Sequence, residues 1–229
     1  MYKIRAILFD LDNTLVDFRQ MKEEACRAAV RGMKTAGLDM SEDEAYTQLM
    51  ATYFEVGIES DIAFTEFLKS IGQFDHKVLA AAINKYLKTK LEFARPYPHV
   101  EAVLQELQKR GIALAIVTDA PKTKAYQRLL LMGIESYFKF LVGFEDTNMP
   151  KETGLPLRNA LELLRKEIPD LTNKDVMMVG DSAPRDVLPA RRLGLRTALC
   201  TYGGSTYEKA VADYDLAEID DIIKIIDDA

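Results

Sequence analysis

Short apolar runs separated by amphipathic helical segments constrain the fold of this chain more than any other feature of its sequence. Each run is bounded by Gly, Asp or Thr, as is typical of strands that are buried on both faces of a sheet. The runs predict five strands, at residues 4–9, 112–117, 140–143, 176–179 and 197–200.

Helical periodicity follows the later strands. Apolar residues recur at i, i+3, i+4 and i+7 in three segments, which begin at Val100, Leu157 and Ile219. This spacing places the apolar side chains on one face of a helix. Because strands that alternate with helices form parallel sheets covered on both faces, we expect a doubly wound, Rossmann-like α/β core.

The segment between the first two predicted strands contains no clear strand of its own. Helical spacing begins there at Phe64 and at Leu79, and residues 20–37 predict a further helix. A parallel crossover needs only about a dozen residues, so most of this segment is an inserted α-helical unit. We expect residues 1–16 and 96–229 to form the core and residues 17–95 to form the insertion.

Composition and charge narrow the function. Apolar residues make up 48% of the chain and charged residues 29%, which predicts a folded protein. A net charge of −6 disfavours non-specific binding to nucleic acid or to anionic membranes. No apolar run approaches the roughly 20 residues that span a bilayer, and the first residues do not resemble a signal peptide, so we expect a cytoplasmic protein. Cys26 and Cys200 lack metal-type spacing and are interpreted as buried packing residues.

Residues that can do chemistry follow the predicted strands. In open parallel sheets, ligands bind at the carboxyl ends of the strands. Five acids, two hydroxyls and one lysine fall at these ends or at the start of the following helix. They are Asp10, Asp12 and Thr14, then Thr118 with Asp119, then Lys151, and finally Asp181 and Asp186.

Two acids directly after the first strand need an explanation, because acids are poor strand formers and are seldom buried. One of them could cap the loop, but that accounts for one acid better than for two. Asp10, Asp12 and Asp181 together would form a pocket of oxygen ligands suited to Mg²⁺. A carboxylate can attack phosphorus, a second can carry the proton, and a lysine with Mg²⁺ can neutralise the phosphoryl oxygens.

Taken in chain order, these residues resemble the four motifs of the haloacid dehalogenase superfamily, and within it the phosphatases. The match covers nearly the whole chain, and each motif stands at a predicted strand end or helix start. The matching residues are Asp10-x-Asp12-x-Thr14, Thr118 at the end of its apolar strand, Lys151, and Gly180-Asp181-x-x-x-x-Asp186.

The resemblance implies a role for each residue. Asp10 would be the nucleophile and a metal ligand. Asp12 would be the general acid and base, and its backbone carbonyl would bind Mg²⁺. Thr118 and the backbone amide of Asp119 would hold the phosphate, while Lys151 would bridge nucleophile and phosphate.

The same resemblance completes the metal site and assigns an activity. Asp181 would bind Mg²⁺, and Asp186 would support the metal or Lys151. The insertion resembles the family's cap, which closes over the site and selects the substrate. The implied protein is a phosphoric monoester hydrolase that forms an aspartyl-phosphate. Its partner would be a small phosphorylated metabolite, without nucleic acid or membrane, and it would be a monomer or homodimer.

Three positions depart from the family pattern. The second motif usually reads Ser/Thr-Asn, whereas here Thr118 is followed by Asp119, whose side chain we expect to point away from the phosphate. The third motif usually runs Lys-Pro-x-Pro, whereas here the proline comes only at Pro156. Relatives often carry glycine at the position of His99, which we interpret as a surface or capping residue.

Other functions on this fold remain open. A 2-haloacid dehalogenase would lack the second acid of the first motif, and Asp12 therefore favours a phosphate ester as substrate. A phosphomutase and a non-catalytic regulatory module are further alternatives. A helical cap favours small substrates such as sugar phosphates, triose phosphates, phosphoglycolate or nucleoside monophosphates. The insertion's aromatic residues fall mostly at core spacing: Phe18, Tyr53, Phe54, Phe64 and Phe67.

Overall fold

The computed structural model describes residues 3–204 and 211–228. The chain divides into two compact units. The core unit comprises Met1–Asp17 and Arg95–Ala229, and the inserted unit comprises Phe18–Ala94. Each boundary differs by one residue from the one expected from sequence.

Within the described residues, the core unit is built on a six-stranded sheet in which every neighbouring pair of strands is parallel. The strand order is β3-β2-β1-β4-β5-β6, so β1 lies in the interior of the sheet. The sixth strand was not predicted, because Tyr214 and Asp215 are polar and partly exposed at the sheet edge and form no apolar run. The strands are β1 (Ala6–Phe9), β2 (Ala113–Val117), β3 (Leu141–Val142), β4 (Val176–Gly180), β5 (Arg196–Cys200) and β6 (Tyr214–Leu216).

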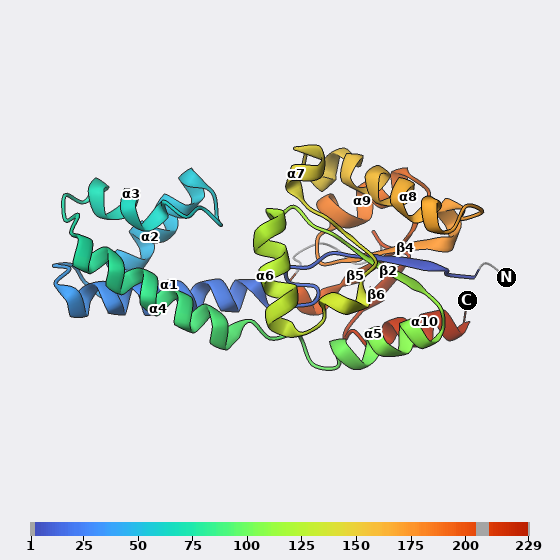
Figure 1. Cartoon of the computed structure of the whole chain (residues 1–229), viewed down its shortest axis with the longest axis horizontal. Coiled ribbons are helices and arrows are strands. Elements are labelled where there is room, and N and C mark those ends of the chain that lie inside the picture. The colour runs from blue at the N-terminus through green and yellow to red at the C-terminus, as the bar shows by residue number, and fades with distance from the viewer. Residues whose placement is uncertain (1–2, 205–210, 229) are drawn as a thin grey trace. The chain divides into compact units, whose positions relative to one another are not determined.

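Helices cover both faces of this sheet (Figure 1). Alternate residues of β1 point to opposite faces, so that Ile7 and Phe9 join one apolar cluster and Ala6 and Leu8 join the other. The expected doubly wound α/β fold is therefore confirmed. The helices of the core unit are α5 (Val100–Lys109), α6 (Lys122–Met132), α7 (Phe144–Thr147), α8 (Leu155–Glu167), α9 (Leu188–Arg192) and α10 (Asp221–Asp228).

Short helical turns shape the loops of the core unit. In the described part of the chain, four of these turns are 3₁₀ turns, and η4 is a single turn of π-helix. Single π-helical turns often occur at functional sites. They are η1 (Glu135–Tyr137), η2 (Lys151–Thr153), η3 (Asn173–Asp175), η4 (Ala183–Val187) and η5 (Thr201–Gly203).

The inserted unit consists of α1 (Phe18–Ala36), α2 (Glu42–Val56), α3 (Ala63–Ser70) and α4 (His76–Phe93). We did not predict α2, although Ser41 caps it by accepting a hydrogen bond from the amide of Glu44. Among the aromatic residues expected in the core, Tyr53, Phe64 and Phe67 are buried. The expectation was wrong for Phe54, which is 78% exposed because its position is turned away from the buried face of α2 that Leu49 and Tyr53 form.

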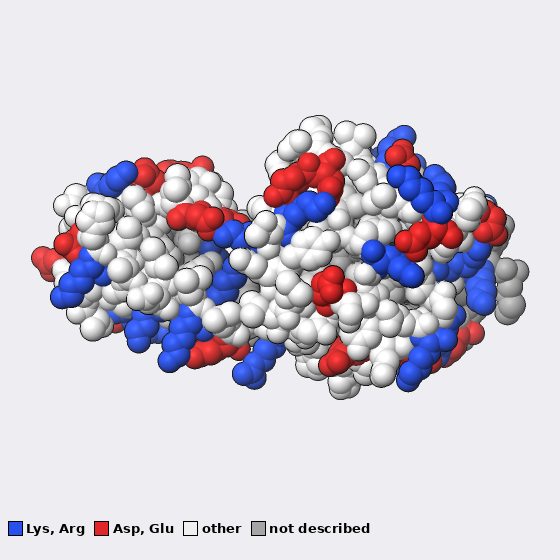
Figure 2. Space-filling view, in the orientation of Figure 1, with Lys and Arg blue, Asp and Glu red and all other residues white. Residues whose placement is uncertain are grey.

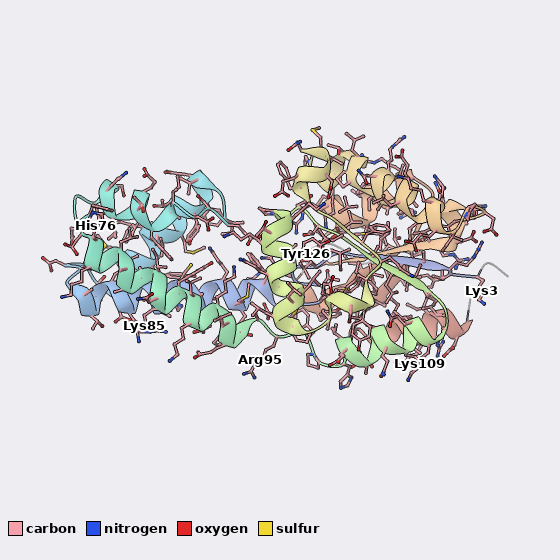
Figure 3. The ribbon with its side chains drawn as sticks, in the orientation of Figure 1. Lys3, His76, Lys85, Arg95, Lys109 and Tyr126 are labelled. Carbon is pink, nitrogen blue, oxygen red and sulfur yellow. The ribbon has the colours of Figure 1, made fainter. Side chains whose placement is uncertain are left out.

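A glycine allows α1 and α4 to approach closely. A β-carbon built on Gly32 of α1 would lie 2.8 Å from the carbonyl oxygen of Ala81 on α4. The chain leaves α4 at Arg95, which Figure 3 labels. Pro96 then forms an antiparallel bridge with Val16. The two chain segments that join the units are thus paired within the core unit.

Surface charges of both signs lie side by side on the face of the core unit that Figure 2 shows. Ion pairs of the core unit include Arg5–Asp170 at 2.9 Å and Lys122–Asp146 at 2.8 Å. Exposed pairs of this kind usually contribute no more than about 1 kcal/mol to stability. Among the described residues, no helix combines the length and apolar character needed to cross a membrane.

Candidate active site

The first acid of the site is placed by the end of β1. The amide of Asp10 continues the sheet by donating to the carbonyl of Val179 at 2.8 Å. The side chain is buried, and its Oδ2 accepts a hydrogen bond from the hydroxyl of Thr14 at 3.2 Å. Asp10 is therefore a carboxylate held at the carboxyl edge of a central strand.

Lys151 is brought to this carboxylate from a distant loop. Its Nζ lies 2.5 Å from Oδ1 of Asp10 and 2.5 Å from Oδ1 of Asp186. The side chain is 1% exposed. Burial by itself lowers the pKa of Lys151, but the nearby carboxylates of Asp10 and Asp186 more than offset that effect and raise it above the ordinary value. Lys151 is therefore a fixed positive charge.

Asp186 comes from η4 and fits only because residue 180 is glycine. A β-carbon at Gly180 would lie 2.4 Å from the carboxyl group of Asp186. The other carboxyl oxygen of Asp186 accepts the amide of Ser182 at 3.0 Å. Burial raises the pKa of Asp186, and the nearby ammonium of Lys151 opposes that shift. The glycine of the fourth motif thus has a steric function.

Three buried carboxylates meet in this site. Asp10, Asp181 and Asp186 each offer an oxygen, and these oxygens lie within 4.8 Å of one another. The three carboxylates face the buried ammonium of Lys151, while Arg185 approaches Asp181 with 3.7 Å between Nη2 and Oδ1. Hard oxygen ligands with surplus negative charge are what Mg²⁺ binds. The residues present therefore fit a divalent cation.

Thr118 and Asp119 occupy the loop after β2. Thr118 is buried, and its hydroxyl accepts the amide of Ala120 at 3.1 Å. The carboxylate of Asp119 accepts the backbone amide of Lys151 at 2.8 Å. Asp119 therefore ties the second motif to the third, a contact that we did not expect. Lys122, the first residue of α6, pairs with Asp146.

Asp12 lies outside the cluster of three carboxylates. Its side chain contacts Arg128 on α6 instead: Nη2 donates to Oδ2 at 3.0 Å, and Nε lies 3.0 Å from Oδ1. We did not identify Arg128 from sequence. The available signal was its position between Ala125 and Leu129, on the apolar side of α6. A ligand role for the backbone carbonyl of Asp12 stays a prediction.

His99 precedes α5 with a φ of 67°, in the left-handed region that favours glycine. This backbone conformation is consistent with the glycine that relatives often carry there. The side chain is exposed, makes no capping hydrogen bond and lies 2.5 Å from Asp220. His99 is thus a surface residue.

The model of the haloacid dehalogenase-like hydrolases matches residues 7–200, well over half of the chain. The chain belongs to this family. Membership confirms the resemblance drawn from the four motifs and makes this protein a hydrolase.

Two relatives of this hydrolase resemble it over nearly its whole length. The glyceraldehyde 3-phosphate phosphatase of Methanocaldococcus jannaschii is 28% identical, with 97% of each chain covered. The phosphoglycolate phosphatase of Aquifex aeolicus is 26% identical, covering 98% of this chain and 97% of the other. Both act, by name, on phosphate esters of small metabolites.

A solved structure shares the fold of this hydrolase. It is the HAD-hydrolase YfnB of Bacillus subtilis, solved bound to magnesium. The TM-score is 0.70 at 20% identity, and the alignment covers 98% of this chain and 99% of the other. The likeness supports the fold class, and the magnesium is a property of that protein.

Proposed function

We propose that this protein hydrolyses phosphate monoesters of small metabolites in a magnesium-dependent reaction, with Asp10 as the nucleophile. That it is a phosphatase is confirmed by its family and by the phosphatases that resemble it along their full length. The observation that carries the finer proposal is the bonding of one buried lysine to Asp10 and Asp186 beside a third carboxylate, Asp181.

The reaction follows from what each residue can do. The carboxylate of Asp10 attacks phosphorus, and the bond between phosphorus and the ester oxygen breaks. The departing alkoxide takes a proton from Asp12. Water then attacks the aspartyl-phosphate while Asp12 removes its proton, which releases phosphate and restores Asp10. Lys151 holds Asp10 in place and neutralises negative charge throughout.

The metal belongs to the three-carboxylate cluster. Asp10, Asp181 and Asp186 would hold it, assisted by the carbonyl of Asp12. When bound, Mg²⁺ supplies positive charge that stabilises the phosphoryl oxygens in the transition state. The residues of the chain provide the complementary hydrogen bonds, with Thr118 and the amide of Asp119 contributing to phosphate binding.

The substrate proposal rests on what the two relatives share. Glyceraldehyde 3-phosphate and phosphoglycolate are phosphate monoesters of three-carbon and two-carbon metabolites, named for proteins of nearly equal identity to this chain. We therefore propose esters of this size as substrates. The inserted unit would act as the cap that selects them. Asp12, which a dehalogenase does not need, favours phosphate esters over haloacids.

The test is release of inorganic phosphate from a panel that includes glyceraldehyde 3-phosphate, phosphoglycolate, glucose 6-phosphate and a nucleoside monophosphate. Activity should require Mg²⁺, fall to background in excess chelator and return on adding Mg²⁺. Acid quenching should trap a phosphoenzyme in the wild type and none in Asp10→Asn. Asp170→Asn, which removes a surface acid paired with Arg5, is the matched control and should retain full activity.

Two results would contradict the proposal. Undiminished hydrolysis in chelator would remove the metal from the mechanism. Turnover by Asp10→Asn at the wild-type rate would require a different nucleophile.

A further inference from the structure

Arg128 is a charged residue at a core position. It lies on α6, two residues beyond Tyr126, which Figure 3 labels. Its side chain is 0% exposed. Ala125 and Leu129, one turn before it and directly after it, are also buried, so Arg128 occupies the side of the helix that packs inward. Fully buried arginines are rare unless the guanidinium is paired.

The guanidinium meets the carboxylate of Asp12 across 116 positions of sequence. Nη2 donates to Oδ2, and Nε lies opposite Oδ1, each at 3.0 Å. The guanidinium thus holds one oxygen by a hydrogen bond and the other by an ion-pair contact, and contact with both oxygens restricts the plane of the carboxylate more than contact with one oxygen would. Each carboxylate oxygen has two lone pairs, so this contact leaves capacity for a proton.

The two members of the pair differ in exposure. Arg128 is completely enclosed, whereas the side chain of Asp12 is 21% exposed. The arginine therefore supports Asp12 from inside the core and leaves part of the acid accessible. Asp12 also follows Asp10 by two residues, so the direction of its carboxylate is set relative to the proposed nucleophile.

We propose that Arg128 is the positioning residue that orients Asp12 for proton transfer to the leaving group. This inference rests on the proposed phosphatase mechanism. An orienting pair differs from a purely structural ion pair. A structural pair contributes only to folding, so losing it would affect the hydrolysis of every substrate alike. An orienting pair matters most when the leaving group needs a proton.

The experiment compares two esters that differ in this need. p-Nitrophenyl phosphate has a leaving group stable as an anion, and glyceraldehyde 3-phosphate has an alkoxide leaving group. General acid catalysis contributes about 10²- to 10⁴-fold. Arg128→Met should therefore lower kcat for glyceraldehyde 3-phosphate by about 10- to 100-fold and for p-nitrophenyl phosphate by less than about threefold. KM should change little for either ester.

A graded variant and a second background sharpen the test. Arg128→Lys keeps the charge but lacks the planar fork, so it should recover part of the lost kcat. In an Asp12→Asn background, Arg128→Met should cause little further loss, because the oriented proton carrier is already absent. Lys122→Met, on the same helix, removes a surface pair and should leave the ratio of the two kcat values unchanged.

The possible outcomes distinguish a failure of this inference from a failure of the proposed phosphatase function. Equal losses on both esters in folded Arg128→Met and Arg128→Lys would make Arg128 structural and overturn the inference. A rise in KM with unchanged kcat would make it a substrate ligand, with the same consequence. If Arg128→Met does not fold, Arg128→Lys alone decides by the same ratio. Wild-type protein that releases no phosphate would instead overturn the proposed function, and this inference with it.

Discussion

Among the residues that the structure describes, both units contain a buried lysine, and the two lysines are surrounded by different chemistry. In the core unit, Nζ of Lys151 lies between the carboxylates of Asp10 and Asp186. In the inserted unit, Nζ of Lys22 lies 3.4 Å from the ring centroid of Tyr53 and donates to the hydroxyl of Tyr86 at 3.1 Å. The side chains are 1% and 5% exposed, respectively.

The difference indicates what each lysine does. Aromatic rings stabilise a cation by about 0.5 to 2 kcal/mol, and Tyr53 and Tyr86 come from α2 and α4 while Lys22 comes from α1. Lys22 thus joins three helices of its unit. The carboxylates around Lys151 carry more negative charge than its one positive charge can balance. This excess is unfavourable for folding, but it suits the binding of a cation and, with it, a phosphoryl group. A buried lysine surrounded by aromatic rings therefore indicates a structural role, whereas a buried lysine surrounded by carboxylates indicates a role in the active site.

The largest expected effect tests this contrast directly. Lys151→Met should lower kcat by about 10²- to 10³-fold, because removing one electrostatic contact to the transition state has effects of this size. Lys22→Met should lower the free energy of unfolding by about 1 to 2 kcal/mol and leave kcat for p-nitrophenyl phosphate within about threefold. Steady-state kinetics and urea denaturation of both variants measure the two quantities. A large loss of kcat in folded Lys22→Met would contradict the assignment of a purely structural role to Lys22.

Substituting one glycine in each unit should have a smaller effect. Gly180→Ala would place a methyl group 2.4 Å from the carboxyl group of Asp186, and Gly32→Ala would place one 2.8 Å from the carbonyl of Ala81. Overpacking costs about 1 to 3 kcal/mol in stability, which both variants should show by urea denaturation. Only Gly180→Ala should also lose activity, because Asp186 supports Lys151. Equal activity in the two folded variants would show that the site tolerates displacement of Asp186.

The smallest effect concerns the two cysteines. Burial raises the pKa of Cys26 from 9.0 to about 11, with Lys22 opposing the shift, and burial also raises the pKa of Cys200. A raised thiol pKa contributes stability that is present below pH 9 and lost as the pH rises through 11. Alkylation needs the thiolate. At about pH 8, iodoacetamide should therefore label the native protein at least about 10-fold more slowly than the urea-unfolded protein. Rapid labelling of Cys26 in native protein would indicate that the inserted unit opens readily.

Much of the fold was predictable because its signals are local. Five of the strands follow from apolar runs, and the motif residues follow from their position at strand ends. The misses have equally local causes. Strand β6 is short and polar at the sheet edge, and α2 has weak periodicity although Ser41 marks its start. Phe54 is exposed because its helix turns that position outward, which composition does not indicate.

The sequence predicted which residues form the candidate site, but it did not predict all of the contacts between them. Asp10, Lys151, Asp181 and Asp186 were named from sequence, and the structure brings them together. The hydrogen bond from the amide of Lys151 to Asp119 was not predicted, because a residue type does not specify which distant backbone group its side chain will contact.

Amino-acid order alone was enough to establish the alternation of strands and helices, the place of the insertion and the order of the motifs, since each depends on residues close together in the chain. The pairing of Asp12 with Arg128 depended on the packed fold. Its two members are 116 positions apart, and they meet because β1 and α6 pack around one core. The close fit of Asp186 against Gly180 likewise appears only once the backbone path is set. Side-chain direction at a site is a property of packing, and packing joins residues that the sequence separates.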